Sequence, residues 1–264
     1  MKFIFAAMPA ACLMAVSQVT WSSPSADEIM QKNFFASKPT RLQKEITMTL
    51  VNDRGEKRER KIEAVTSLQA NGIDSNMLVR FLAPADVKGT SFLEIEHSEA
   101  DDDQWIYLPA MHKSRRLVSS NRKDSFIGSD FAYGDVLPPK VSLYQNKLLR
   151  EEQTEGVQCY VVESIPANDD VKRDYGYGRK VSWIAEDSFH EVRVEYFDVT
   201  NRPLKTEIVR GITLVEPANS RYAPTYKEMS NLQTGHKTIV TADHYTTEAS
   251  IGADTYSLRN LEKD

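Results

Sequence analysis

Few residues that could perform covalent or metal chemistry occur at the spacing that such chemistry needs. The five histidines, His97, His112, His190, His236 and His244, form neither the His-x-x-x-His nor the His-Glu-x-x-His pattern of a zinc site. The sequence contains no Gly-x-Ser-x-Gly motif, the strained turn that exposes a hydrolase nucleophile. We therefore expect no metal site and no catalytic residues, and we expect that the protein is not an enzyme.

Two other motifs have structural explanations. Cys159 lies in the alternating run Val157 to Ile165, which predicts a buried small side chain and not a reactive thiolate. Gly176-Tyr177-Gly178 lies in a turn rich in Asp, Arg and Tyr, without the strand-to-helix context of a dinucleotide site. We expect no cofactor.

Three consecutive carboxylates, Asp101, Asp102 and Asp103, precede Trp105. Carboxylates suit hard cations, so a cation site is one interpretation. The run lacks the spaced ligands and the glycine of a calcium loop, which favours the other interpretation, a solvated hairpin tip.

The composition indicates a folded protein that does not act mainly on nucleic acid. The 264 residues carry a formal net charge of −5, with both signs interspersed along the chain. Charged residues make up 27%, and 11 Gly with 11 Pro give no sign of a disordered or fibrous chain. The length suffices for one large all-β domain or two small domains.

The N-terminus has the layout of a secretory signal. Lys2 is followed by an apolar run from Phe3 to Val16 and then by small and polar residues. The run is shorter than the roughly 20 residues of a membrane-spanning helix. We expect residues 1–23 to be a signal peptide, cleaved after Ser17 or nearer Ser22.

Cys12 offers a different interpretation, attachment of a lipid, because Ala10 and Ala11 precede it as a small-residue pair. Pro9 stands where an aliphatic residue is expected, which argues against it. If Cys12 leaves with the signal, Cys159 is the remaining cysteine and no intramolecular disulfide can form.

The elements that would position any site are mostly strands. Ser25 and Glu28 form a capping box, which predicts an amphipathic helix over residues 25–37. From Arg41 onward the apolar residues alternate, and roughly a dozen strands are separated by short turns. A short helix is expected near Ser129 to Val136.

This pattern predicts a mainly β (α+β) fold. No helix-length segment lies between consecutive strands, so the sheet should be antiparallel. An open sheet of this size must curl as strand twist accumulates. We expect one domain, residues 24–264, formed by a single strongly curved antiparallel sheet, with helices covering its concave face.

The most distinctive motifs lie between residues 80 and 136. They are Arg80-Phe81-Leu82-Ala83-Pro84-Ala85-Asp86-Val87-Lys88-Gly89-Thr90, Gln104-Trp105-Ile106-Tyr107-Leu108-Pro109-Ala110, Lys113-Ser114-Arg115-Arg116-Leu117 and Ser125-Phe126-Ile127-Gly128-Ser129-Asp130-Phe131-Ala132-Tyr133-Gly134-Asp135-Val136. This series resembles the outer-membrane lipoprotein-sorting (LolA-like) family, in particular its larger periplasmic branch.

The resemblance implies an incomplete β-barrel of the LolA/LolB type around an apolar cavity that accepts acyl chains. It implies a periplasmic carrier of a lipid or a lipidated protein, taking part in outer-membrane lipid or lipoprotein transport. It also implies an inner-membrane transporter of the resistance-nodulation-division (RND) type as a partner. The alternative is an adaptor or sensor that docks on such a transporter without cargo.

Apolar side chains on alternating strands or in the aromatic loop are the candidates for the lipid-binding lining. They are Ile46, Met48, Leu50, Phe81, Phe92, Trp105, Tyr107, Phe126, Phe131 and Trp183. Trp105 and Tyr107 share one face of their strand, where they either line the cavity or pack the core.

Two other segments carry open alternatives. The basic cluster Lys113, Arg115, Arg116, Arg122 and Lys123 either contacts anionic head groups or forms a solvated strand edge that resists pairing with another sheet. The loop around Gly128 has either a structural role, with Gly128 in an unusual backbone conformation, or the role of a gate to the cavity.

Overall fold

The computed structural model describes residues 23–138, 140–248 and 250–263. The predicted signal peptide, apart from Ser23, lies outside these residues, and so do Cys12 and the two predicted cleavage sites. No helix in the described ranges is long and apolar enough to cross a membrane.

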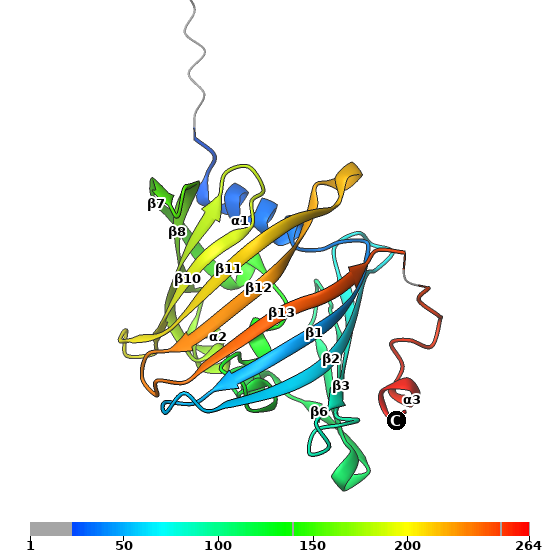
Figure 1. Cartoon of the computed structure of the whole chain (residues 1–264). Coiled ribbons are helices and arrows are strands. Elements are labelled where there is room, and N and C mark those ends of the chain that lie inside the picture. The colour runs from blue at the N-terminus through cyan, green and yellow to red at the C-terminus, as the bar shows by residue number, and fades with distance from the viewer. Residues whose placement is uncertain (1–22, 139, 249, 264) are drawn as a thin grey trace, which may run out of the picture.

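One antiparallel sheet of thirteen strands dominates the molecule (Figure 1). The strands are β1 (Arg41–Val51), β2 (Lys57–Leu68), β3 (Ser75–Ala83), β4 (Ser91–Ile95), β5 (Asp103–Leu108), β6 (Lys113–Leu117), β7 (Tyr144–Thr154), β8 (Val157–Pro166), β9 (Tyr177–Ala185), β10 (Glu191–Asp198), β11 (Pro203–Glu216), β12 (Arg221–Asn231) and β13 (Lys237–Thr246). Their order is β6-β5-β4-β3-β2-β1-β13-β12-β11-β10-β9-β8-β7.

The sheet is strongly curved but does not close into a barrel, because β6 and β7 remain its two ends. Figure 1 shows the long central strands β11, β12, β13 and β1 wrapping around the segments behind them. Nearly all connections join neighbours in the sheet, and the pairing of β1 with β13 joins the two halves of the chain. The predicted curved antiparallel sheet is therefore confirmed.

Within the described residues, three short α-helices accompany the sheet: α1 (Ala26–Ala36), α2 (Asp169–Tyr175) and α3 (Leu258–Leu261). The predicted capping box of α1 is present, with the Glu28 amide donating to Ser25 Oγ at 3.3 Å and the Ser25 amide donating to Glu28 Oε2 at 2.7 Å. α1 packs with Ile29 and Met30 against Val162 of β8 and Ile184 of β9. It therefore covers part of the concave face.

The largest apolar cluster lies on the concave face and unites strands from both halves of the chain with the loop before β7. Phe126 and Tyr133 of this loop pack edge-to-face, with ring centroids 5.4 Å apart. Phe126 also lies 5.4 Å from the ring of Phe92 on β4. This loop fills the middle of the half-barrel.

The short helix expected near Ser129 to Val136 is present as a single turn of 3-10 helix, Tyr133–Asp135, and a second such turn, Phe126–Gly128, precedes it. Gly128 has a φ of +74°, and Ser125 forms a β-bridge with Ala132, so the chain folds back on itself. Such a reversal is incompatible with a continuous helix.

Candidate functional site: an amphipathic cavity under the sheet

A cavity of about 280 Å³ lies on the concave side of the sheet. Strands β1 to β3 and β9 to β13 contribute to its wall, together with α1 and the loop of residues 126–138. Because the cavity joins both halves of the chain, its lining depends on the curvature of the whole sheet.

One part of the wall is apolar. Ile46 and Met48 of β1 point into the cavity because they share one phase of the strand, and the loop adds Phe126 and Phe131. Neighbouring strands contribute Ile62 and Ala64 of β2 and Met77 and Val79 of β3. We call these residues the apolar pole; alternation places its strand residues, as expected for the inner face of a half-barrel, and the loop supplies the two phenylalanines.

The other part of the wall is charged. We call the charged and polar side chains that line this part the polar pole: Lys44, Asp135, Lys180, His190, Glu191, Tyr196, Glu207 and Lys227. Its carboxylates are held by specific partners: Glu207 accepts hydrogen bonds from the Tyr196 hydroxyl at 2.9 Å and the Lys227 ammonium at 2.9 Å. The polar pole is therefore an ordered network.

Asp135 is a second enclosed carboxylate of the polar pole. Its Oδ2 lies 2.6 Å from Lys205 Nζ, and the Tyr177 hydroxyl donates to its Oδ1 at 2.8 Å. Burial alone would favour the neutral acid, but the ammonium of Lys205 and these hydrogen bonds keep the pKa of Asp135 below its usual range. Asp135 is therefore a buried anion that fixes the loop to β9 and β11.

Two lysines of the polar pole lack such a partner. Among the described residues, neither Lys44 nor Lys180 has a carboxylate at ion-pair distance, and Lys180 Nζ instead lies 4.4 Å from the ring centroid of Tyr144. Burial, together with the nearby Lys227 ammonium, lowers the pKa of Lys44 to about 8. Burial also lowers the pKa of Lys180.

His190 completes the polar pole as a neutral group. Burial lowers the pKa of its imidazole to about 4, and Lys227 and Lys44 act in the same direction. Its Nδ1 lies 3.2 Å from the backbone oxygen of Glu191. The positive charge around the cavity at neutral pH therefore comes from the lysines.

The structure places the predicted lining residues in three groups. Ile46, Met48, Phe126 and Phe131 line the cavity. Leu50, Phe81 and Phe92 belong to the apolar core on the same face, and Phe81 and Phe92 are fully buried there. Contact of any of these side chains with a lipid stays a prediction.

The third group, Trp105, Tyr107 and Trp183, lies on the outer face of the sheet, so its expected place in the cavity has to be corrected. On β5, Ile106 points inward, and the alternation sends its two aromatic neighbours outward to pack near Leu261 of α3.

On β9, Lys180 points into the cavity, and Trp183 has the opposite phase. Its indole packs beside the buried Cys159 and donates a hydrogen bond to Glu152. Cys159 is buried, as predicted, and burial raises the pKa of its thiol to about 11.

Sequence reasoning missed the polar pole. The available signal was a charge at an inward strand position: Lys44 is in phase with Ile46 and Met48. Alternation identifies the face of such a residue, but most other groups of the polar pole come from β9 to β12, and no local pattern predicts that approach.

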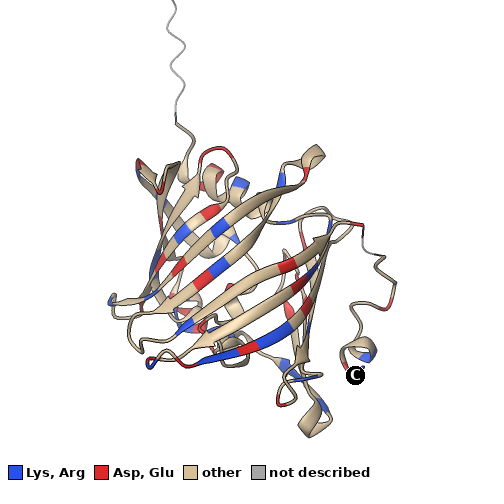
Figure 2. Ribbon diagram, in the orientation of Figure 1, with Lys and Arg blue, Asp and Glu red and all other residues tan. Residues whose placement is uncertain are grey.

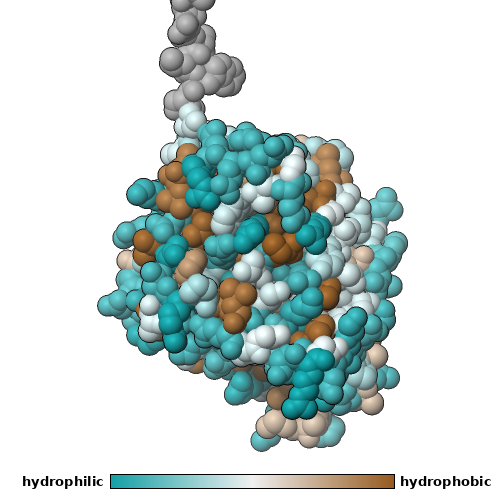
Figure 3. Space-filling view, turned by 60° about the vertical axis from the view of Figure 1, so that its left-hand side comes forward, coloured by the Kyte–Doolittle hydropathy of each residue, from teal (hydrophilic) through white to brown (hydrophobic). Residues whose placement is uncertain are grey.

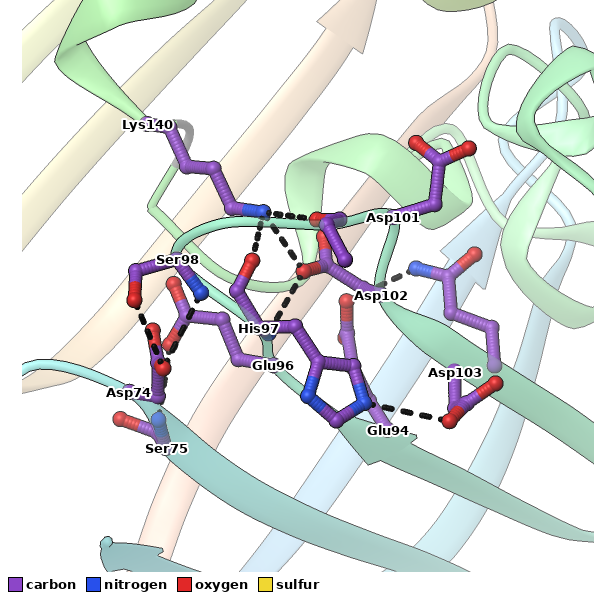
Figure 4. Close-up of polar contacts among 12 residues, drawn as sticks. Asp74, Ser75, Glu94, Glu96, His97, Ser98, Asp101, Asp102, Asp103 and Lys140 are labelled. Atoms are coloured by element: carbon purple, nitrogen blue, oxygen red, sulfur yellow. Dashed lines mark hydrogen bonds and ion pairs between the residues drawn. The ribbon is translucent and has the colours of Figure 1, made fainter. Parts of the chain in front are cut away.

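A second polar cluster lies under the loop between β4 and β5 (Figure 4). Lys140 Nζ lies 2.9 Å from Asp102 Oδ1, and Arg122 approaches the same carboxylate at 3.6 Å. Asp101 is exposed, whereas Asp102 is largely buried, so the interpretation as a solvated hairpin tip holds only for part of the run. Among the described residues no group of His, Cys, Asp and Glu could hold a metal ion.

The predicted basic cluster does not form one surface. Lys113, Arg115 and Arg116 lie on β6, which is an end strand of the sheet, in agreement with the strand-edge interpretation. Arg116 is paired with Asp103, and Arg122 is buried beside Asp101 and Asp102. Contact of this cluster with anionic head groups stays a prediction.

The outer surface gives a weaker indication of a site. Figure 2 shows Lys and Arg interspersed with Asp and Glu along the strands. On the face shown in Figure 3, hydrophobic residues form small separate groups among hydrophilic ones. The cavity is therefore the better candidate for a binding site.

A family model described as "uncharacterized protein" matches residues 74–263, which is more than two thirds of the chain. Among curated proteins, no sequence matches the chain.

Solved structures provide closer comparisons. A putative outer membrane lipoprotein-sorting protein domain from Vibrio parahaemolyticus is similar with 26% identity and a TM-score of 0.81, over 90% of this chain and 98% of that one. A DUF1329 family protein from Desulfovibrio piger has 24% identity and a TM-score of 0.81, over 89% of this chain and 97% of that one.

A LolA superfamily protein from Nitrosomonas europaea has 18% identity and a TM-score of 0.68, over 90% of this chain and 100% of that one. At this identity the likeness concerns the fold, and the shared fold is the curved open sheet described above.

Proposed function

This chain belongs to the outer-membrane lipoprotein-sorting (LolA-like) family, and from that premise we propose that it is a periplasmic carrier of a lipid or a lipidated protein. In this proposal an acyl chain of the cargo occupies the cavity on the concave face of the sheet. The protein acts by binding and release and performs no covalent step.

The apolar pole of the cavity is the observation that carries the proposal. Met48, Met77, Phe126 and Phe131 surround space that a hydrocarbon chain can fill. Each methylene moved from water into such a site contributes about 0.8 kcal/mol. Transfer onward requires only that the next acceptor binds the chain more tightly than this cavity does.

The size of the cavity supports a single chain. Its volume of about 280 Å³ lies just below the range of about 300–1,000 Å³ that is typical of small-molecule sites. We therefore expect one acyl chain per protein, with longer cargo requiring movement of α1 or of the loop of residues 126–138.

Native mass spectrometry of the protein purified from the periplasm of its producing cells tests the proposal, followed by extraction and identification of any bound molecule. A stoichiometric lipid or acylated peptide is the expected result. A protein that is empty, and that also fails to bind a fluorescent fatty acid, would contradict the carrier function. That outcome would favour an adaptor that docks on an RND-type transporter, which co-purification with the transporter would then test.

Catalysis in the same cavity is the second candidate, and one observation favours it. Titratable side chains with shifted pKa values converge there, among them Lys44 and His190. Turnover of a fluorogenic acyl ester by the purified protein, lost in a Lys44→Met variant, would support this candidate over the carrier.

A further inference from the structure

The polar pole holds more positive than negative charge. Counted with Lys205, it contains four lysines, Lys44, Lys180, Lys205 and Lys227, and three carboxylates, Asp135, Glu191 and Glu207. Lys205 is bound to Asp135, and Lys227 to Glu207. The third carboxylate, Glu191, accepts a hydrogen bond from Ser182 at 2.8 Å.

Lys180 is the more enclosed of the two lysines without an ion pair. It is 7% exposed, and its Nζ lies over the ring of Tyr144. Glu191, Asp135 and Glu207 attract this ammonium, but none of them lies at ion-pair distance from it. Burying an ammonium without a direct anionic partner is unfavourable, and a fold that needed only stability would place an apolar residue there. This position therefore offers an ammonium that a bound anion could pair with directly.

Lys44 reaches the same pole from the opposite wall. It lies on β1, whereas Lys180 lies on β9, so the two ammonium groups approach the cavity from both halves of the curved sheet. Lys227 of β12 is one-third exposed despite its bond to Glu207, so it still has donors free for a ligand. Three donors thus converge on one end of a cavity whose other end is apolar.

We propose that Lys44, Lys180 and Lys227 bind the anionic head of an amphiphile, a carboxylate or a phosphate, whose acyl chain lies against the apolar pole. This inference rests on the proposed carrier function and narrows its cargo to acidic lipids. A head group with one or two negative charges offsets the excess of lysines, and each ammonium supplies hydrogen bonds to it. Neutral acylated cargo would leave the ammonium groups without an anion.

Calorimetric titration of the delipidated protein at pH 7 with three ligands that share one tail tests this inference. Palmitate carries a carboxylate, palmitoyl lysophosphatidylglycerol carries a phosphate, and methyl palmitate carries neither, and all are used below their micelle concentrations. We expect at least one anionic ligand to bind roughly ten- to a hundredfold more tightly than the ester, the ratio typical of a charge-assisted hydrogen bond. The two anionic ligands distinguish a fatty acid from a phospholipid.

Two variants locate the effect. Lys44→Met and Lys180→Met keep an unbranched side chain of nearly the same length and remove its charge, and we expect each to reduce the affinity for the anionic ligand about tenfold while leaving the affinity for the ester unchanged. Lys61→Met is the matched control, because Lys61 lies on the outer face of β2 and pairs with Asp243 at the surface. Two variants at separate strands keep the test informative if one of them fails to fold.

The possible outcomes distinguish a failure of the anionic-head site from a failure of the proposed carrier function. Equal binding of palmitate, the lysophospholipid and the ester would overturn the anionic-head site and leave the carrier function intact. An unchanged preference in both lysine variants would also overturn it. If none of the three ligands binds, the carrier function fails, and the head-group site fails with it.

Discussion

Lys44 occupies an inward strand position that alternation would assign to an apolar side chain. Because its charge is buried there, it destabilises the ligand-free protein. Burial and the nearby Lys227 lower its pKa to about 8, compared with 10.5 in the unfolded chain. Charged or titratable groups of the same pole face it from β9 (Lys180), β10 and the preceding turn (Glu191, His190), β11 (Glu207) and the loop (Asp135).

The folded and unfolded pKa values of Lys44 determine how its contribution to stability changes with pH. Between about pH 8 and pH 10.5 the unfolded chain binds a proton at Lys44 that the folded protein does not, so Lys44 makes stability rise with pH in this window. We expect Lys44→Met to stabilise the ligand-free protein at pH 7 by roughly 1 to 3 kcal/mol, with the gain disappearing above about pH 10.5. Urea unfolding of both proteins at several pH values measures this, and a destabilised variant at pH 7 would contradict it.

The buried pair of Asp135 and Lys205 should behave in the opposite way. Both side chains are almost completely buried, and Asp135 also binds Tyr177. Asp135→Asn leaves the Lys205 ammonium without its anion, so we expect a loss of about 3 to 5 kcal/mol in the free energy of unfolding. The double variant Asp135→Asn, Lys205→Met should recover part of this loss. If the double variant is as unstable as the sum of the two single ones, the pair is not coupled.

Individual residues were predictable from the sequence only where one strand decides their place. Ile46 and Met48 both line the cavity because they share one phase of β1. Trp105 and Trp183 were misplaced because alternation divides residues between two faces without saying which face is concave. The clusters around Cys159 and Leu261 show that this outer face also buries aromatic side chains.

At the scale of elements, α1 depends on its N-terminal cap. The Ser25 hydroxyl accepts the Glu28 amide, and Met30 and Asn33 of the helix line the cavity. We expect Ser25→Ala to lower stability by about 1 kcal/mol and to increase hydrogen exchange of the amides of α1. Ser25→Asp should preserve both, since aspartate is an equally good cap. Unchanged exchange in the alanine variant would show that packing on β8 and β9 alone holds the helix.

Elements with strong local signals were predicted, and those that depend on distant contacts were not. The strands and α1 follow from alternation and from the capping box. The loop of residues 126–138 takes its form from contacts such as the hydrogen bond from the Asp130 amide to Thr238 Oγ1 on β13, which lies more than a hundred residues away. A local pattern contains no information about that contact.

At the scale of the whole molecule, the cavity exists because the sheet curves without closing. β1 pairs with β13, and this pairing brings the apolar residues of β1 to β3 next to the charged residues of β9 to β12. The sequence predicted the curved sheet from strand number and twist. Predicting that the cavity has an apolar and a polar end would have required the register of the strands, because each pole combines residues from several strands.

Ligand binding in this cavity should stabilise the entire sheet. At a free ligand concentration of 100 times Kd, binding adds about 2.7 kcal/mol, which for a chain of this size raises Tm by roughly 5 to 10 °C. We expect this shift with palmitate or palmitoyl lysophosphatidylglycerol, whichever binds more tightly, in thermal unfolding followed by circular dichroism.

Ala64 of β2 lines the cavity, so Ala64→Phe should fill the space of the acyl chain and abolish the shift in Tm. Ala70→Phe is the matched control, because Ala70 is exposed in the turn between β2 and β3. It should respond to the ligand as the original protein does. An undiminished shift in the Ala64 variant would mean that the ligand binds elsewhere, for instance at the second hollow lined by Val192, Ile208 and Tyr222. In that case the charged end of the central cavity would need another explanation.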